Sequence, residues 1–266
     1  MLTVFRMKPA GIFTNANVFG IMMIFAAPFW IAAAVWSKNT ILRIIAGILA
    51  LILSVSIILT NSRSAIVGLL FSVIFYFAVA KKLKYFLSII AILSVILLSS
   101  PLFRIVTSVG LRVERAGTGR VEIWKDTLEL IKQNAIFGVG AGNFPEAYRP
   151  YFESAFEKGF MKNISHSHNE VLHLFVELGI MGLVLILVLY YIPLKRGFAL
   201  LKRPLSDFDR IILYGSMGIL FANLGNSFFD ANTMLADGGL FRPILYWITV
   251  IVVLKMYQKY SADNYA

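Results

Sequence analysis

Residues 40–60 read TILRIIAGILALILSVSIILT, an apolar stretch interrupted by a single charge, Arg43. A membrane-spanning helix needs about 20 predominantly apolar residues, because it rises 1.5 Å per residue through a hydrocarbon layer about 30 Å thick. This stretch therefore predicts a transmembrane helix. The whole chain agrees, since 59% of its 266 residues are hydrophobic and 15% are charged. That composition excludes a soluble enzyme and a disordered chain.

Seven stretches of this kind predict an all-α, polytopic membrane protein. They cover residues 18–36, 40–60, 64–80, 85–100, 171–194, 211–229 and 240–256. We expect one integrated domain in three parts: four spans in 1–100, a water-facing loop subdomain with amphipathic helices in 101–170, and three spans in 171–266. The chain has no cysteine, so disulfides, thiolate metal sites and a thiol nucleophile are excluded.

The basic residues outside the 101–170 loop predict the orientation. Alternate short loops divide them into twelve on one side and four on the other. The twelve are Lys38, Arg43, Lys81, Lys82, Lys84, Lys195, Arg196, Lys202, Arg203, Arg210, Lys255 and Lys259, and the four are Arg6, Lys8, Arg63 and Arg242. The positive-inside rule makes the twelve cytoplasmic. We therefore expect a multi-pass protein of the cytoplasmic membrane with loop 101–170 outside and a cytoplasmic C-terminus. The net charge of +11 then belongs to membrane loops, and no nucleic-acid partner is expected.

Seven spans with a cytoplasmic C-terminus require an external N-terminus. Residues 1–17 carry Arg6 and Lys8 with no span before them, and they lack the pattern of a signal peptide. We therefore expect this chain to be the C-terminal part of a longer protein whose earlier spans are missing or encoded separately.

The external loop contains one strongly patterned helix. Residues 120–134, RVEIWKDTLELIKQN, place Val121, Trp124, Leu128 and Ile131 at helical spacing with charges between them. Such a helix lies on the outer membrane surface or packs against the ends of the spans. The following FGVGAGNF, residues 137–144, lacks the ending of a nucleotide-binding P-loop, so its glycines predict a structural turn.

Aromatic residues and histidines follow this turn. The aromatic residues Tyr148, Tyr151, Phe152, Phe156 and Phe160 either stack on sugar rings or lie at the headgroup level. The three histidines of the chain, His166, His168 and His173, cluster where the loop meets the fifth span. The acids near them are Glu170 and Glu177, and no Asp or Cys stands at ligand spacing, so we predict no metal site.

His168 is a candidate general base, because a neutral imidazole at an external membrane boundary is well suited to take a proton from a hydroxyl. The alternative is an interfacial or capping histidine. Arg63, in the turn between two spans, either snorkels to lipid headgroups or binds phosphate through its planar fork. Arg120 supplies a second fork at the start of the loop helix. Two external arginines and a histidine suit a reaction whose leaving group is a lipid pyrophosphate.

Three segments resemble the O-antigen ligase family and the related Wzy-type polysaccharide polymerases. They are NSRSAIVG (61–68), TGRVEIWKDTLELIKQNAIFGVGAGNF (118–144) and HNEVLHLFVELGIMG (168–182), with GIFTNANVFG (11–20) as a further similar stretch. In the family, His-Asn is followed after nine residues by Gly-x-x-Gly. Here His168-Asn169 is followed after nine residues by Gly179-Ile180-Met181-Gly182.

The resemblance implies a membrane glycosyltransferase acting on the outer side of the cytoplasmic membrane. Its donor would be a glycan on undecaprenyl pyrophosphate, and its acceptor a sugar hydroxyl on a glycan or lipid-glycan. His168 would be the catalytic base and Arg63 and Arg120 would bind the pyrophosphate, with Asn169 and Trp124 in supporting roles and no metal or other cofactor. Family members usually have ten to twelve spans, so seven fall short of the pattern.

Two other functions stay open. A flippase or permease for a lipid-linked or anionic substrate would use the arginines to line a path, but such proteins more often carry ionisable residues within their spans. A truncated, non-catalytic family member or accessory subunit is the other alternative. The ligase and polymerase reactions differ mainly in the acceptor, which no short motif identifies.

Overall fold

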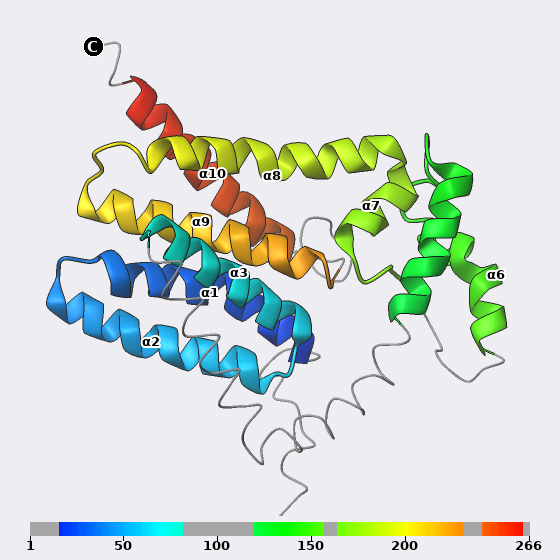
Figure 1. Ribbon diagram of the computed structural model, residues 1–266, viewed down its shortest axis with the longest axis horizontal. Coiled ribbons are helices and arrows are strands. Elements are labelled where there is room, and N and C mark those ends of the chain that lie inside the picture. Colours follow the sequence, from blue (N-terminus) through cyan, green and yellow to red (C-terminus); the bar gives the residue numbers. More distant parts are fainter. Residues whose placement is uncertain (1–15, 82–119, 157–163, 231–240, 263–266) are drawn as a thin grey trace, which may run out of the picture. The chain divides into compact units, whose positions relative to one another are not determined.

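The computed structural model describes residues 16–81, 120–156, 164–230 and 241–262. Every regular element in these ranges is a helix, which confirms the all-α class for the described part of the chain (Figure 1). Three of the described helices are long and apolar enough to cross a membrane, namely α1 (Ala16–Trp36), α2 (Thr40–Leu59) and α8 (Ile180–Leu200). The apolar helix α3 (Arg63–Val79) has 17 residues. The expected span over 85–100 lies outside the described residues.

Two further helices, α9 (Asp207–Ser227) and α10 (Phe241–Ala262), occupy the positions of the last two expected spans. They are less apolar than α1, α2 and α8, and the count of seven spans stays a prediction. For α9 the reason is its burial, since Ser216, Asn223 and Asn226 are all enclosed by protein. A helix surrounded by other helices does not need the fully apolar surface that lipid requires.

The expected span over 171–194 is wrong as a single helix. The structure divides it into α7 (Glu170–Leu178) and α8, with Gly179 between them. Gly179 has φ +63° and ψ −150°, a conformation that L-residues other than glycine rarely adopt. A Cβ at this position would also collide with the carbonyl oxygen of Ile136. The candidate span therefore begins at Ile180, and α7 belongs to the part of the chain that precedes it.

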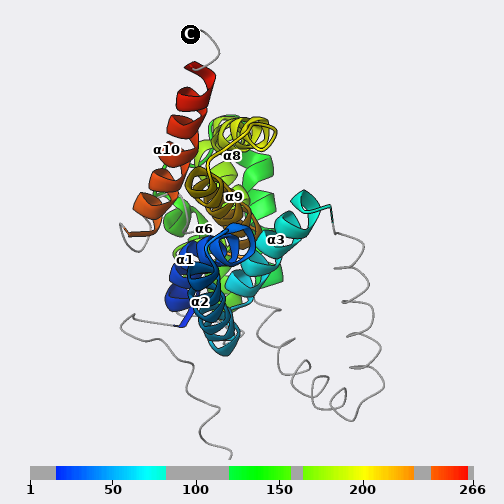
Figure 2. The ribbon, with the colours of Figure 1, turned by 90° about the vertical axis from the view of Figure 1, so that its left-hand side faces the viewer.

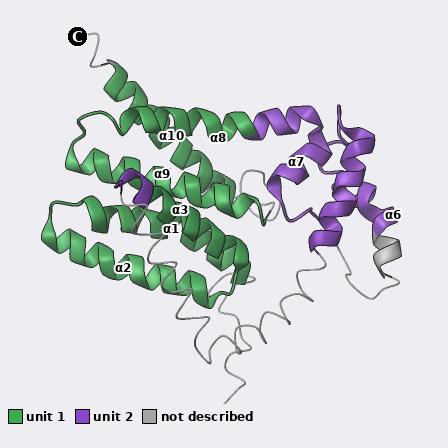
Figure 3. Ribbon diagram, in the orientation of Figure 1, with its two compact units in different colours: residues 1–76, 187–266 green, residues 77–186 purple. Residues whose placement is uncertain are grey.

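The chain forms two compact units (Figure 3). Unit 1 comprises residues 1–76 and 187–266, and unit 2 comprises residues 77–186. Unit 2 thus contains the 101–170 loop together with α7 and the first turns of α8.

In unit 1, α9 contacts both α1 and α10 (Figure 2). Glycines on α9 allow its close approach to α1 and α3, since a Cβ at Gly215 would meet the Phe29 ring of α1 and one at Gly218 would collide with Tyr76 of α3. The hydroxyl of Tyr76 donates a hydrogen bond of 2.6 Å to the carbonyl of Pro28, the helix-interior proline of α1. This bond ties α3 to α1.

Helix α2 presents an apolar face outward. Asn39 caps its start, where the side chain accepts a hydrogen bond of 3.0 Å from the Leu42 amide. Three of its 20 residues are buried, namely Ala46, Ala50 and Ile57. In contrast, the large apolar side chains of Ile41 and Leu51 are 71% and 65% exposed. An apolar surface of this kind is unfavourable in water and is typical of a helix that faces lipid.

One end of unit 1 gathers basic loops that are far apart in the sequence. Lys38, in the turn between α1 and α2, lies 3.1 Å from Asp207 at the start of α9. Lys259, near the end of α10, lies 2.9 Å from Asp209. Three of the loops that charge patterning assigns to the same side therefore meet at this basic end, which we define by Lys38, Asp207, Asp209 and Lys259.

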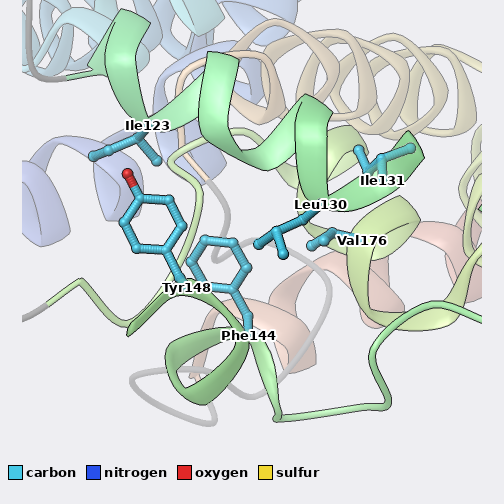
Figure 4. Close-up of a cluster of buried hydrophobic side chains, with 6 residues drawn as sticks. All are labelled: Ile123, Leu130, Ile131, Phe144, Tyr148 and Val176. Atoms are coloured by element: carbon cyan, nitrogen blue, oxygen red, sulfur yellow. The ribbon is translucent and has the colours of Figure 1, made fainter. Parts of the chain in front are cut away.

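Unit 2 has a core of its own (Figure 4). Its buried members come from the helical residues 120–134, from α6 (Phe144–Phe156) and from α7, and they are Ile123, Leu130, Ile131, Phe144, Tyr148 and Val176. The expected apolar face is partly wrong, because Val121 and Leu128 are 47% and 46% exposed. The buried face instead runs through Ile123 and Leu130, because α6 and α7 cover that side. This helix packs on its neighbours in unit 2 through that face.

Candidate functional site

The glycine turn joins the helix over 120–134 to the end of α7. The amides of Val139 and Gly140 donate hydrogen bonds of 2.8 and 2.9 Å to the carbonyls of Val176 and Glu177. In return, the amide of Ile180 donates a bond of 2.9 Å to the carbonyl of Ala135. The expectation of a structural turn is thereby confirmed, and the pairing holds the two helices that flank the candidate site.

The backbone before α7 is fixed from both sides. The indole Nε1 of Trp124 donates a hydrogen bond of 2.9 Å to the carbonyl oxygen of Ser167. The Ser167 hydroxyl, which is fully buried, donates a bond of 2.8 Å to the carbonyl of Asn169. The Asn169 side chain caps α7 by accepting a bond of 3.0 Å from the Leu172 amide. His168 thus lies in a loop whose two neighbours are both anchored.

His168 has a left-handed backbone conformation, with φ +53°. Among residues other than glycine, Asn, Asp and His adopt this region most often, at a cost of roughly 1–2 kcal/mol. Its amide donates a hydrogen bond of 3.2 Å to Nδ1 of His166, and the two rings meet edge to face with centroids 4.2 Å apart. Strained backbone of this kind clusters at functional sites.

The electrostatic surroundings keep His168 neutral. Burial, then the neighbouring His166 and then the positive charge of Arg120, lower the pKa of His168 from 6.5 to about 3. Two of the predicted site residues, His168 and Arg120, therefore lie in the same region of unit 2. Trp124 and Asn169 fix the backbone on either side of His168.

Arg63, the third predicted site residue, belongs to unit 1. It begins α3 and its side chain is exposed, between the buried residues Ser62 and Ser64. Its pairing with His168 and Arg120 in one site stays a prediction.

The three clustered histidines do not act as a group. His173 points into the core of unit 2, where its ring meets Phe144 edge to face at 5.3 Å. Its Nε2 lies 3.7 Å from Oε1 of Glu177, and both side chains are less than 10% exposed. Oε1 of Glu177 also accepts a hydrogen bond of 3.4 Å from the Phe144 amide. His173 and Glu177 therefore join α7 to the start of α6.

The aromatic residues after the turn are also partly structural. Tyr148 is 2% exposed, and its hydroxyl donates a hydrogen bond of 2.7 Å to Asp126. Burial and the Asp126 carboxylate raise the pKa of Tyr148 above its usual value. The ring of Tyr148 is thus too buried to stack on a sugar. Tyr151 is half-buried and stacks on it at 5.8 Å, whereas the side chains of Phe152 and Phe156 and all of Phe160 lie outside the described residues.

Two residues near His168 were missed as site components by sequence reasoning. Ser167 gives no signal in the sequence, because a serine in a loop is ordinary. His166 is visible in the sequence as one of the three clustered histidines, but spacing could not reveal that its ring contacts His168 and that its Nδ1 accepts a hydrogen bond from the His168 amide.

Comparison of the sequence with protein families identifies one family. The family model described as O-antigen ligase matches residues 48–187, which is more than half of the chain and includes Arg63, Arg120 and His168. No curated protein matches the chain.

Proposed function

The chain belongs to the O-antigen ligase family, a family of membrane enzymes of the glycan ligase and polymerase type, and from this premise we propose that it transfers a glycan from undecaprenyl pyrophosphate to a sugar hydroxyl. The reaction takes place at the outer face of the cytoplasmic membrane. The observation that carries the proposal is that Arg120 lies near enough to His168 in unit 2 to lower its pKa, so that a neutral base and a permanent positive charge share one region.

In the proposed reaction, His168 accepts the proton of the acceptor hydroxyl. The hydroxyl oxygen forms a bond to the anomeric carbon of the donor sugar, and the bond between that carbon and the pyrophosphate breaks. Undecaprenyl pyrophosphate leaves with the electron pair. Arg120 and Arg63 stabilise the negative charge that develops on the leaving group, since guanidinium groups bind phosphate in a bidentate manner. No metal or nucleotide is needed, because the donor is already activated.

Donor binding would also prepare the base. In the free protein the charge of Arg120 disfavours the protonated form of His168. A pyrophosphate bound to Arg120 offsets that charge, so His168 becomes a stronger base once the donor is in place.

Trp124 and Asn169 act as positioning residues in this proposal. They hold the carbonyl of Ser167 and the first turn of α7, and the loop between them carries His168. The charge pattern of the sequence supports an external site, since the positive-inside rule makes the loops rich in Lys and Arg cytoplasmic and thereby places residues 101–170 outside.

The experiment is glycan transfer from an undecaprenyl pyrophosphate donor by membranes that contain the chain, with a chelator present throughout. We expect transfer by the unchanged protein, loss of turnover with retained donor binding in His168→Ala, and weakened donor binding in Arg120→Gln. The matched control is Arg149→Gln, since Arg149 is an exposed arginine of the same unit paired with Glu146 at 2.8 Å. Full transfer by His168→Ala would refute its role as the base.

A further inference from the structure

A cavity lies between α8 and α10 at the basic end of unit 1. Its volume is about 340 Å³, within the lower part of the range of roughly 300–1,000 Å³ that is usual for small-molecule sites. Aromatic, basic and small residues line it, namely Tyr191, Ile192, Lys195, Arg196, Ala199 and Tyr257. The proposed transfer reaction uses none of them.

The two helices that form the cavity are held together just before it. The hydroxyl of Tyr246 donates a hydrogen bond of 3.1 Å to the carbonyl of Leu189, and the rings of Tyr190 and Tyr246 meet at 5.9 Å. Beyond this contact the helices make a second one, where the guanidinium of Arg196 lies over the Tyr257 ring at 5.2 Å. The cavity is therefore an open one, lined by α8 on one side and by Tyr257 of α10 on the other.

Among the described residues, the two cations of the cavity contact aromatic rings and no carboxylate. Nζ of Lys195 lies 5.3 Å from the centre of the Tyr191 ring, and Arg196 lies over Tyr257 as described. Within the described ranges neither of these cations forms an ion pair, whereas Lys38 and Lys259 at the same end are each paired with an aspartate. Two positive charges that no carboxylate of the described ranges offsets favour an anionic ligand in the cavity.

The surface that adjoins the cavity is apolar. Val188, Tyr191, Ile192, Lys195 and Ala199 follow one another at helical spacing, so they share one face of α8. On or beside this face Leu187 is 62% exposed and Val188 is 42% exposed. A ligand that fills the cavity and continues along α8 therefore has an anionic head and an apolar tail.

We propose that this cavity binds the headgroup of an anionic phospholipid from the leaflet at the basic end. The phosphate contacts Lys195 and Arg196, and an acyl chain lies along Leu187 and Val188. Tyrosines at the level of the headgroups are typical of membrane interfaces, and basic pockets between helices on the cytoplasmic side are suited to lipid phosphates. The site is independent of the glycan-transfer reaction.

The test is native mass spectrometry of the full chain in detergent, with phosphatidylglycerol or zwitterionic phosphatidylcholine added at equal concentrations. We expect phosphatidylglycerol to bind more tightly. Replacing both cations, Lys195→Gln with Arg196→Gln, should weaken its binding roughly tenfold or more, as the loss of two lipid-facing charges implies. The control Lys202→Gln removes one charge from the same end outside the cavity and should leave binding unchanged.

A second variant guards against misfolding. Ala199→Phe fills the cavity without changing any charge, and it should also weaken phosphatidylglycerol binding. Equal binding of the two lipids, or equal loss in Lys202→Gln, would overturn the proposal in favour of general charge attraction. Displacement of the lipid by millimolar inorganic phosphate would show that the site recognises free phosphate and would refute the lipid. Since no glycan transfer is measured, these outcomes do not depend on the proposed enzymatic function.

Discussion

The indole Nε1 of Trp124 donates a hydrogen bond of 2.9 Å to the carbonyl oxygen of Ser167, 43 residues later in the chain. This contact joins the helical residues 120–134, which begin with Arg120, to the loop that carries His168. A change at Trp124 is therefore expected to reach His168 through the backbone of its neighbour.

Trp124→Phe removes the N–H donor and keeps an aromatic ring. We expect kcat for glycan transfer to fall several-fold with little change in the KM for the donor, because the base is misplaced while the arginines remain. Steady-state kinetics with varied donor check this split. The control is Trp247→Phe, at an exposed position of α10, and a change confined to KM would contradict the positioning role.

The pKa of His168 should respond to Arg120. Because the arginine charge is one of three causes that lower the pKa from 6.5 to about 3, Arg120→Gln should raise it, though not to 6.5, since burial and His166 remain. NMR titration of the His168 ring measures the shift, with Arg149→Gln as the control. An unchanged pKa in Arg120→Gln would refute the electrostatic link.

The same shift affects stability below neutral pH. Between about pH 6.5 and pH 3 the unfolded chain binds a proton at residue 168 that the folded chain does not. Stability therefore rises with pH across this window. In His168→Asn this contribution is absent, so the dependence of the thermal midpoint on pH should be flatter than in the unchanged protein. Parallel pH dependences for the two proteins would count against a depressed pKa.

Gly179→Ala should destabilise unit 2 more than Gly142→Ala does. Both glycines have positive φ, +63° and +76°, so both substitutions carry a backbone cost of roughly 1–2 kcal/mol. At Gly179 a Cβ also collides with the carbonyl of Ile136, whereas at Gly142 nothing lies within 4 Å. Thermal unfolding of the two variants compares them directly, and equal losses would show that the junction between α7 and α8 tolerates a side chain.

The absence of cysteine makes the orientation easy to measure. Glu146→Cys lies in the loop expected outside, and Lys202→Cys lies in a loop expected inside. In intact cells we expect a membrane-impermeant maleimide to label the first and spare the second, and permeabilised cells should show both. The reverse pattern would invert the orientation and move the proposed transfer reaction to the cytoplasmic side.

Much of the local structure follows from the sequence alone. Apolar stretches of the right length predict α1 and α2, because a segment in the membrane core has few alternatives to a helix, whereas the stretch over 171–194 did not show where α8 begins. The sequence places the histidine cluster where the external loop meets the next apolar stretch, and His168 does lie in a loop, directly before Asn169, which caps α7. The charge pattern also predicted which loops share a side, and the ion pairs of Lys38 and Lys259 join three of them.

Only the tertiary structure decided which side chains face one another. Helical spacing alone could not show that α6 and α7 cover Ile123 rather than Val121. It could not separate His173, which packs on Phe144, from His168, which contacts His166. Nor could it show that the Arg196 guanidinium lies over the ring of Tyr257, 61 positions later in the chain. Periodicity follows from the backbone of one helix, but partners depend on how several helices pack, and that is a property of the whole fold.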